Sequence, residues 1–134
     1  TIPISITIST SGTVAFGIMT ANSAQDTTAS GLNDVETISV DQGPADLDVR
    51  SGNFSDGGNS WTLNTTNGAD QVKWEFSPDG SAWITFTVVD TLYSLATNVA
   101  QSGTQNMYLK LTTPTSTTSY SQYSSTVTIV ASAP

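Results

Sequence analysis

Thr1-Ile2-Pro3-Ile4-Ser5-Ile6-Thr7-Ile8-Ser9-Thr10 opens the chain with the cleanest alternation of apolar and polar residues in the sequence. Isoleucine fills every even position from Ile2 to Ile8, and proline, serine or threonine fills the odd positions between them. Because successive side chains of a β-strand point to opposite faces, a strand here places four isoleucines on one face. Function depends on whether that face packs into its own domain or into a neighbouring subunit.

The same parity continues beyond Ser11-Gly12 into residues 13–19, with apolar side chains at Val14, Phe16 and Ile18. A turn at Ser11-Gly12 predicts a hairpin between residues 2–9 and 13–19. A straight run instead predicts one strand of about 55 Å at roughly 3.3 Å per residue, which would overhang a domain of this size. The sequence leaves both arrangements open.

The composition of the 134-residue chain favours β-structure. Hydrophobic residues make up 37%, which suffices for one domain with its own core. Serine and threonine together form roughly a third of the chain, and helix-favouring Lys, Arg and Glu are scarce. Further alternating stretches bounded by turn residues lie at 35–41, 45–51, 60–64, 104–112 and 126–131.

This pattern predicts an all-β fold of about nine or ten short strands, arranged as an antiparallel β-sandwich of the immunoglobulin-like or jelly-roll kind. Asn67-Gly68 and Asp79-Gly80 predict two tight hairpins in the middle of the chain. Residues 92–99 are ambiguous between a strand and a short helical turn. The predicted division is an N-terminal strand at 1–10, a hinge at 11–12 and a sandwich domain at 13–134.

The charge excludes several classes of partner. The net charge is −8, and the cations are Arg50, Lys73 and Lys110, so neither nucleic acid nor an anionic membrane surface is an expected partner. No apolar run reaches the roughly 18 residues that a membrane-spanning helix needs. The chain begins at Thr1 rather than methionine, which indicates either a removed leader or an incomplete record. We expect a removed leader and an extracellular, cell-surface location.

The sequence offers few residues that could carry out catalysis, because the chain has neither histidine nor cysteine. A serine nucleophile would depend on Lys73 or Lys110, which both read as outward-facing strand residues. Asp46 and Asp48 share one strand face, where solvated surface charges are the expected interpretation. We therefore expect no enzyme and no catalytic residue.

Calcium is the one cofactor that the composition permits. Its ligands would come from Asn33-Asp34-Val35-Glu36, or from Asp46 and Asp48 with Asp56, although neither set matches an EF-hand loop. Asn53 and Asn64 begin triplets that fit the N-glycosylation pattern and are candidate sites for attached glycan, although such triplets often arise by chance in a chain this rich in serine and threonine.

The exclusions leave binding or assembly, and the N-terminal strand is the main candidate. An uncharged, alternating strand at an edge invites pairing with another chain, and the first acidic residue is Asp26. Burial of four isoleucines stabilises a contact by about 6–12 kcal/mol, at roughly 1.5–3 kcal/mol each. If each subunit donates this strand to the next, the contact is head-to-tail, and an open head-to-tail contact builds a filament.

Three features of the chain together resemble one known class of protein. They are the N-terminal stretch Ile2-Pro3-Ile4-Ser5-Ile6-Thr7-Ile8, the entry to the domain at Gly12-Thr13-Val14-Ala15-Phe16-Gly17, and the Ser/Thr-rich β body. The resemblance is to extracellular pilus and matrix-fibre subunits that assemble by donor-strand complementation, of the archaeal bundling-pilus and biofilm-fibre type. It implies a secreted homopolymer with Ile2, Ile4, Ile6 and Ile8 as donor residues and Ser11 and Gly12 as the hinge. The chain departs from chaperone–usher pilins, which usually carry a cysteine pair, and Pro3 cannot donate a ladder hydrogen bond.

The groove that would accept a donated strand is not marked by any motif. If the final strands flank the gap, its lining includes the inward faces around Leu109, Leu111, Val127 and Ile129.

A second hypothesis is a monomeric cell-surface adhesin or carbohydrate-binding module. In that case residues 2–8 form its own first strand, and Trp83, Tyr120 or Tyr123 contacts the ligand. A capsid or surface-layer protein is a third alternative.

Overall fold

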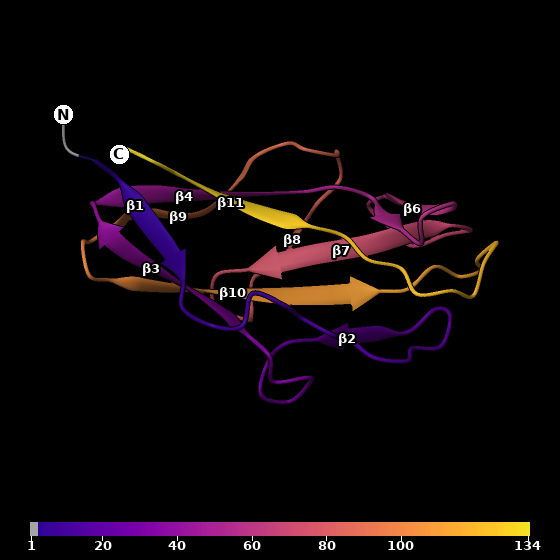
Figure 1. Ribbon diagram of the computed structural model, residues 1–134. Coiled ribbons are helices and arrows are strands. Elements are labelled where there is room, and N and C mark those ends of the chain that lie inside the picture. Colours follow the sequence, from indigo (N-terminus) through magenta and orange to yellow (C-terminus); the bar gives the residue numbers. More distant parts are fainter. Residues whose placement is uncertain (1–2) are drawn as a thin grey trace.

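The computed structural model describes residues 3–134, in which every regular element is a β-strand (Figure 1). The larger sheet contains β1 (Ser5–Ile8), β2 (Ala24–Asp26), β3 (Glu36–Gln42), β5 (Phe54–Ser55), β6 (Ser60–Leu63), β7 (Gln71–Ser77), β8 (Ile84–Thr85) and β10 (Thr104–Thr112). The smaller, antiparallel sheet contains β4 (Ala45–Ser51), β9 (Tyr93–Val99) and β11 (Val127–Ser132). The predicted all-β sandwich is confirmed. Within the described residues, no helix offers the length and apolar character needed to cross a membrane.

Strand β10 is the central element of the larger sheet. Its first half pairs with β3, its second half pairs with β2 on the same side, and β7 pairs along its other side. The predicted alternation is confirmed, because Met107, Leu109 and Leu111 are buried while Tyr108 and Lys110 are half-exposed. The order of strands across the larger sheet is β1-β3-β10-β7-β6-β5.

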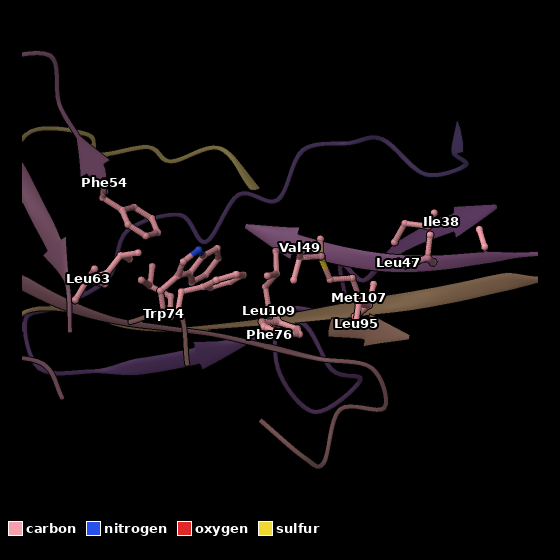
Figure 2. Packing of buried hydrophobic residues seen from close by; sticks show 14 of the residues in the cluster. Ile38, Leu47, Val49, Phe54, Leu63, Trp74, Phe76, Leu95, Met107 and Leu109 are labelled. Carbon is pink, nitrogen blue, oxygen red and sulfur yellow. The ribbon is translucent and has the colours of Figure 1, made fainter. Parts of the chain in front are cut away.

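The core lies between the two sheets, and β4 lies above β10 in the view of Figure 1. Leu47 and Val49 of β4 are fully buried, as the alternation of residues 45–51 predicts. Figure 2 shows the core extending from Phe54 and Trp74 at one end to Ile38 at the other. Each such side chain contributes about 1.5–3 kcal/mol when it is fully buried.

One predicted hairpin is wrong. Strands β6 and β7 flank Asn67-Gly68 but run parallel, with Thr62 opposite Gln71, so the larger sheet is mixed rather than antiparallel. The Asn67 side chain donates hydrogen bonds to Asn22 Oδ1 (2.8 Å) and to the Thr113 carbonyl (2.9 Å), which tie the loop to distant segments. These tertiary contacts compete with the two-residue turn that the local sequence favours.

The other predicted hairpin is confirmed, since β7 and β8 are antiparallel with Phe76 opposite Ile84. Gly80 has a φ of +79°, and the Asp79 carboxylate accepts hydrogen bonds from the amides of Ser81 and Ala82. Residues 93–99 of the ambiguous stretch form β9, so the helical alternative for them is wrong. A short strand, β2, lies within residues 22–31, which read from the sequence as a connection.

The N-terminal segment forms neither the hairpin nor the long straight strand. Strand β1 pairs antiparallel with the edge of β3, with Ile6 opposite Val40 and Ile8 opposite Ile38. Gly12 then has a φ of +74°, a backbone conformation in which glycine carries no steric penalty, and residues 13–19 continue outside any sheet. The N-terminal strand of a single chain therefore packs on its own domain.

Candidate functional site: an open groove beside strand β11

An apolar groove of about 850 Å³ opens over the core on one side of β11. Its floor contains Met107, Leu109 and Leu111 of β10 together with Phe54 and Trp74. Residues 12–19 and residues 120–127 and 129 also line it. Glu36 is the charged member of this lining, so the groove offers mainly apolar contacts.

Strand β11 presents a free edge at this groove. It pairs with β4 along one edge, with Ile129 opposite Val49, and no strand within residues 3–134 pairs with its other edge. Val127 and Ile129 are half-buried and line the groove. A free edge carries unpaired backbone N–H and C=O groups, which can pair with an added strand.

Residues 14–19 form a second stretch with unused main-chain groups. No hydrogen bond joins their backbone to another backbone group of the described chain. The segment nevertheless lies against the domain, because Val14, Phe16 and Met19 pack on the core and the Phe16 ring meets Trp74 edge-on at 5.9 Å. Ile18 is fully exposed. The groove thus adjoins two main-chain segments that can still bind a strand.

The segment 117–123 is tied to the domain by polar bonds. Trp61 stacks on Tyr123 at 4.0 Å, and its ring N–H donates to Thr117 Oγ1 (3.0 Å). The Ser121 hydroxyl donates to Asp56 (2.5 Å), and the side chain and amide of Thr118 donate to Asp70 (2.5 and 2.8 Å).

These hydrogen bonds have an electrostatic consequence for both carboxyl groups. They favour the ionised form, so the pKa of Asp56 falls well below its usual range, first through the Ser121 hydroxyl and then through the amides of Asn59 and Gly58. The Thr118 side chain and then its amide lower the pKa of Asp70 in the same way.

A buried carboxylate holds the predicted hinge. Glu36 is only 4% exposed, and its side chain accepts hydrogen bonds from Thr10 Oγ1 (2.5 Å), the Gly12 amide (2.9 Å) and Ser11 Oγ (3.4 Å). We call this set of contacts the Glu36 clasp. It anchors residues 10–12 to the start of β3 and separates β1 from residues 13–19.

The four residues predicted to line an acceptor groove, Leu109, Leu111, Val127 and Ile129, all line this one groove. Of the predicted donor residues, Ile8 also lines this groove, whereas Ile4 and Ile6 lie outside it. Ile4 and Ile6 pack partly against the core from the edge of β3, Ile8 is 43% exposed, and Ile2 lies outside the described residues. No signal in the sequence places Phe54 in the groove, because it sits in a loop-like stretch. The sequence predicts Trp74 and Met107 only as inward-facing strand residues, with no indication of a groove.

Two of the three aromatic residues of the carbohydrate hypothesis, Tyr120 and Tyr123, line the groove, whereas Trp83 lies apart from it. Lys110 Nζ lies 5.7 Å from the ring centre of Trp83, on the side of β10 that faces away from the core. Tyr123 is stacked on Trp61 within the groove, and Tyr120 stands 91% exposed.

Three of the calcium candidates accept hydrogen bonds from other groups of the protein. Asp46 Oδ1 accepts the Asn98 amide (2.7 Å), Asp56 accepts the amides of its own loop, and Glu36 forms the clasp. Among residues 3–134, no group of three or more acidic, histidine or cysteine side chains is arranged to hold a metal.

The two candidate glycosylation residues also make hydrogen bonds. Asn53 Oδ1 accepts the Leu63 amide (3.0 Å), and Asn64 Nδ2 donates to Gln71 Oε1 (3.2 Å). A sugar on Asn64 would use the nitrogen that makes this bond, so its modification would require the contact with Gln71 to change.

Comparison with known proteins adds no relative: no protein-family model, no curated protein and no solved structure matches the chain. The groove and the N-terminal strand are therefore the features from which we infer the function.

Proposed function

We propose that this protein is the structural subunit of an extracellular, pilus-like filament that polymerises head-to-tail. Each subunit donates its N-terminal strand, with Ile2, Ile4, Ile6 and Ile8, to the groove of the next subunit. The observation that carries the proposal is the groove itself, whose apolar floor adjoins the free edge of β11 and the unpaired backbone of residues 14–19.

An extended strand suits this groove better than a compact ligand does. A strand between two unpaired main-chain segments gains ladder hydrogen bonds, while alternate side chains enter the apolar floor. Residues 1–10 provide such a strand, because they alternate isoleucine with short polar or proline residues and carry no charged side chain. The groove likewise contains no basic side chain that would favour an anionic ligand.

Packing also favours donation to a second copy. On its own domain, β1 leaves Ile8 exposed and Ile4 and Ile6 only half-buried, while the groove beside β11 stays open. Transfer into a neighbour's groove buries both apolar surfaces. Each additional isoleucine that becomes fully buried contributes about 1.5–3 kcal/mol. Because donor and acceptor surfaces differ, the contact is head-to-tail, and a head-to-tail contact that does not close builds a filament.

Deletion of residues 1–10 tests the proposal. The truncated chain should stay folded and monomeric, because the buried core and all of the groove lining except Ile8 lie within residues 11–134, whereas the full chain forms filaments. Electron microscopy and sedimentation measure assembly, and circular dichroism checks the fold.

A peptide of residues 1–10 should bind the truncated chain, and the same peptide with Ile4→Asp and Ile6→Asp should not. Calorimetric titration measures both affinities. Filaments formed by the truncated chain would overturn the proposal, as would a full chain that is monomeric because its strand fills its own groove.

A further inference from the structure

We infer that β1 is stored on the β3 edge of its own subunit before assembly, and that the Glu36 clasp is the fixed point from which it moves to a neighbour's groove. This inference rests on the proposed function and adds to it a stored state and a pivot. It follows from the position of β1 in the single chain, where the strand pairs with β3 and reaches the groove lining only through Ile8.

The stored position is defined by specific contacts. Strand β1 forms an antiparallel ladder with β3, in which Thr7 is opposite Ser39. The Thr7 hydroxyl donates to Asp41, and the Ser9 amide donates to the Thr37 carbonyl (2.9 Å). These bonds cover the edge of β3, and they keep the N-terminal strand from pairing at random with other chains.

The same contacts leave the strand able to depart. The ladder involves four residues of β1 at the outer edge of the sheet, and its register shifts between Ser5 and Ile6. Ile8 is 43% exposed, so little apolar surface holds the end of the strand nearest the clasp. Short, exposed edge elements belong to the parts of a protein that open at the lowest free energy.

The Glu36 clasp sets the limit of the moving segment. Its three hydrogen bonds reach Thr10, Ser11 and Gly12, and Glu36 itself is buried. Beyond the clasp, Val14 and Phe16 pack against the core. Residues before Thr10 can therefore change partner while residues after Gly12 keep theirs.

Engineered disulfides test both parts of the inference, because the chain contains no cysteine. Thr7→Cys with Ser39→Cys joins β1 to its own β3, and Ala24→Cys with Thr112→Cys joins β2 to β10 beyond the clasp. Opposed residues of antiparallel strands have Cα atoms about 4.5–5.5 Å apart, within the roughly 4.4–6.8 Å range of disulfides. Single-cysteine variants serve as controls for the substitutions.

We expect the 7–39 bond to form within the monomer, to block filament formation when oxidised, and to release assembly on reduction. The 24–112 bond should leave the extent and rate of assembly unchanged. In filaments built from reduced Thr7→Cys/Ser39→Cys chains, oxidation should not form the bond within one chain. Gel mobility under non-reducing conditions and light scattering measure these results.

The failures of the two proposals are distinguishable. If the 7–39 bond does not form in the monomer while deletion of residues 1–10 still prevents filaments, the stored state is wrong and strand donation stands. If the oxidised 7–39 chain polymerises like the single-cysteine variants, the strand never leaves and both proposals fall. A 24–112 bond that blocks assembly would show that the moving segment extends past the clasp.

Discussion

At the scale of single residues, the carboxylates of this chain act mainly as acceptors that fix loops. Asp56 and Asp70 hold the segment 117–123 beside the groove, Asp79 closes the β7–β8 turn, and Glu36 holds the hinge. At Asp56, Asp70 and Asp79 the ionised form gains hydrogen bonds that the neutral form loses in part, which lowers the pKa of each carboxyl group. The protein's acidity thus has a local structural role in addition to its effect on net charge.

The lowered pKa values of Asp56 and Asp70 predict loss of stability in acid. A carboxyl group with a lowered pKa in the folded state stabilises that state above its unfolded pKa, near 3.8, and this contribution is lost as the pH falls toward the folded value. We expect Asp56→Asn to unfold more readily than wild type at pH 7, with a difference that shrinks below about pH 4. Denaturant titrations across this range measure the difference.

Asp90→Asn is the matched control, because it removes an exposed carboxylate on another loop. A difference between wild type and Asp56→Asn that stays constant from neutral to acidic pH would contradict the role given to the Asp56 charge.

Phe76 gives a prediction on the core. It is fully buried and packs on Phe86 with ring centres 4.9 Å apart. Phe76→Ala should lower the free energy of unfolding by about 3–5 kcal/mol, because it removes the ring and leaves a cavity. Val88→Ala, at a side chain that is 56% exposed, should change it by less than about 0.5 kcal/mol. Equal effects of the two substitutions, measured by chemical denaturation, would refute this assignment of the core.

At the scale of elements, β11 combines two surfaces in one strand. Ile129 lines the groove, whereas its neighbour Val130 is opposite Asp48 and belongs to the other face. Because successive side chains of a strand point to opposite faces, substitutions at Ile129 and Val130 test the groove and the outer surface separately.

This arrangement predicts opposite outcomes for two neighbouring lysine substitutions. Ile129→Lys should prevent filament formation while the monomer stays folded, because a charge in the groove opposes burial of the donated isoleucines. Val130→Lys should leave assembly intact, because it adds a cation across from Asp48. Electron microscopy and circular dichroism measure assembly and fold. Normal filaments from Ile129→Lys would exclude this groove as the acceptor.

At the scale of the whole molecule, each subunit carries a net charge of −8 while the proposed contact is apolar. Like-charged subunits repel one another over distances that salt screens to about 10 Å at 0.1 M. Filament assembly should therefore become faster, or stay unchanged, as sodium chloride rises toward about 1 M. Light-scattering kinetics measure this rate.

Filaments should also persist when EDTA is added, because the proposed contact uses main-chain bonds and isoleucines rather than metal. Dissolution by EDTA alone would indicate calcium-bridged assembly. Dissolution by salt alone would indicate a contact made by ion pairs.

Local patterns predicted much of the fold. Strands β4 and β10 were predicted with their inward faces, because alternation over seven or nine residues specifies both a strand and its buried side. The short strands β2 and β5 were not predicted, and β8 was predicted only as a hairpin partner without its bounds, since two or three residues carry no such period. The parallel pairing of β6 and β7 was missed because Asn67 bonds to residues far away in the sequence.

The opening segment shows where local information ends. The sequence by itself determined that residues 1–10 favour a strand with one isoleucine face, because a period of two is a property of neighbouring residues. Only the tertiary structure decided that this strand lies on β3 and that the groove beside β11 is open. Partner choice depends on which edges the rest of the chain leaves unpaired, and Phe54, Trp74, Leu111 and Ile129 meet at one groove only after both sheets have formed.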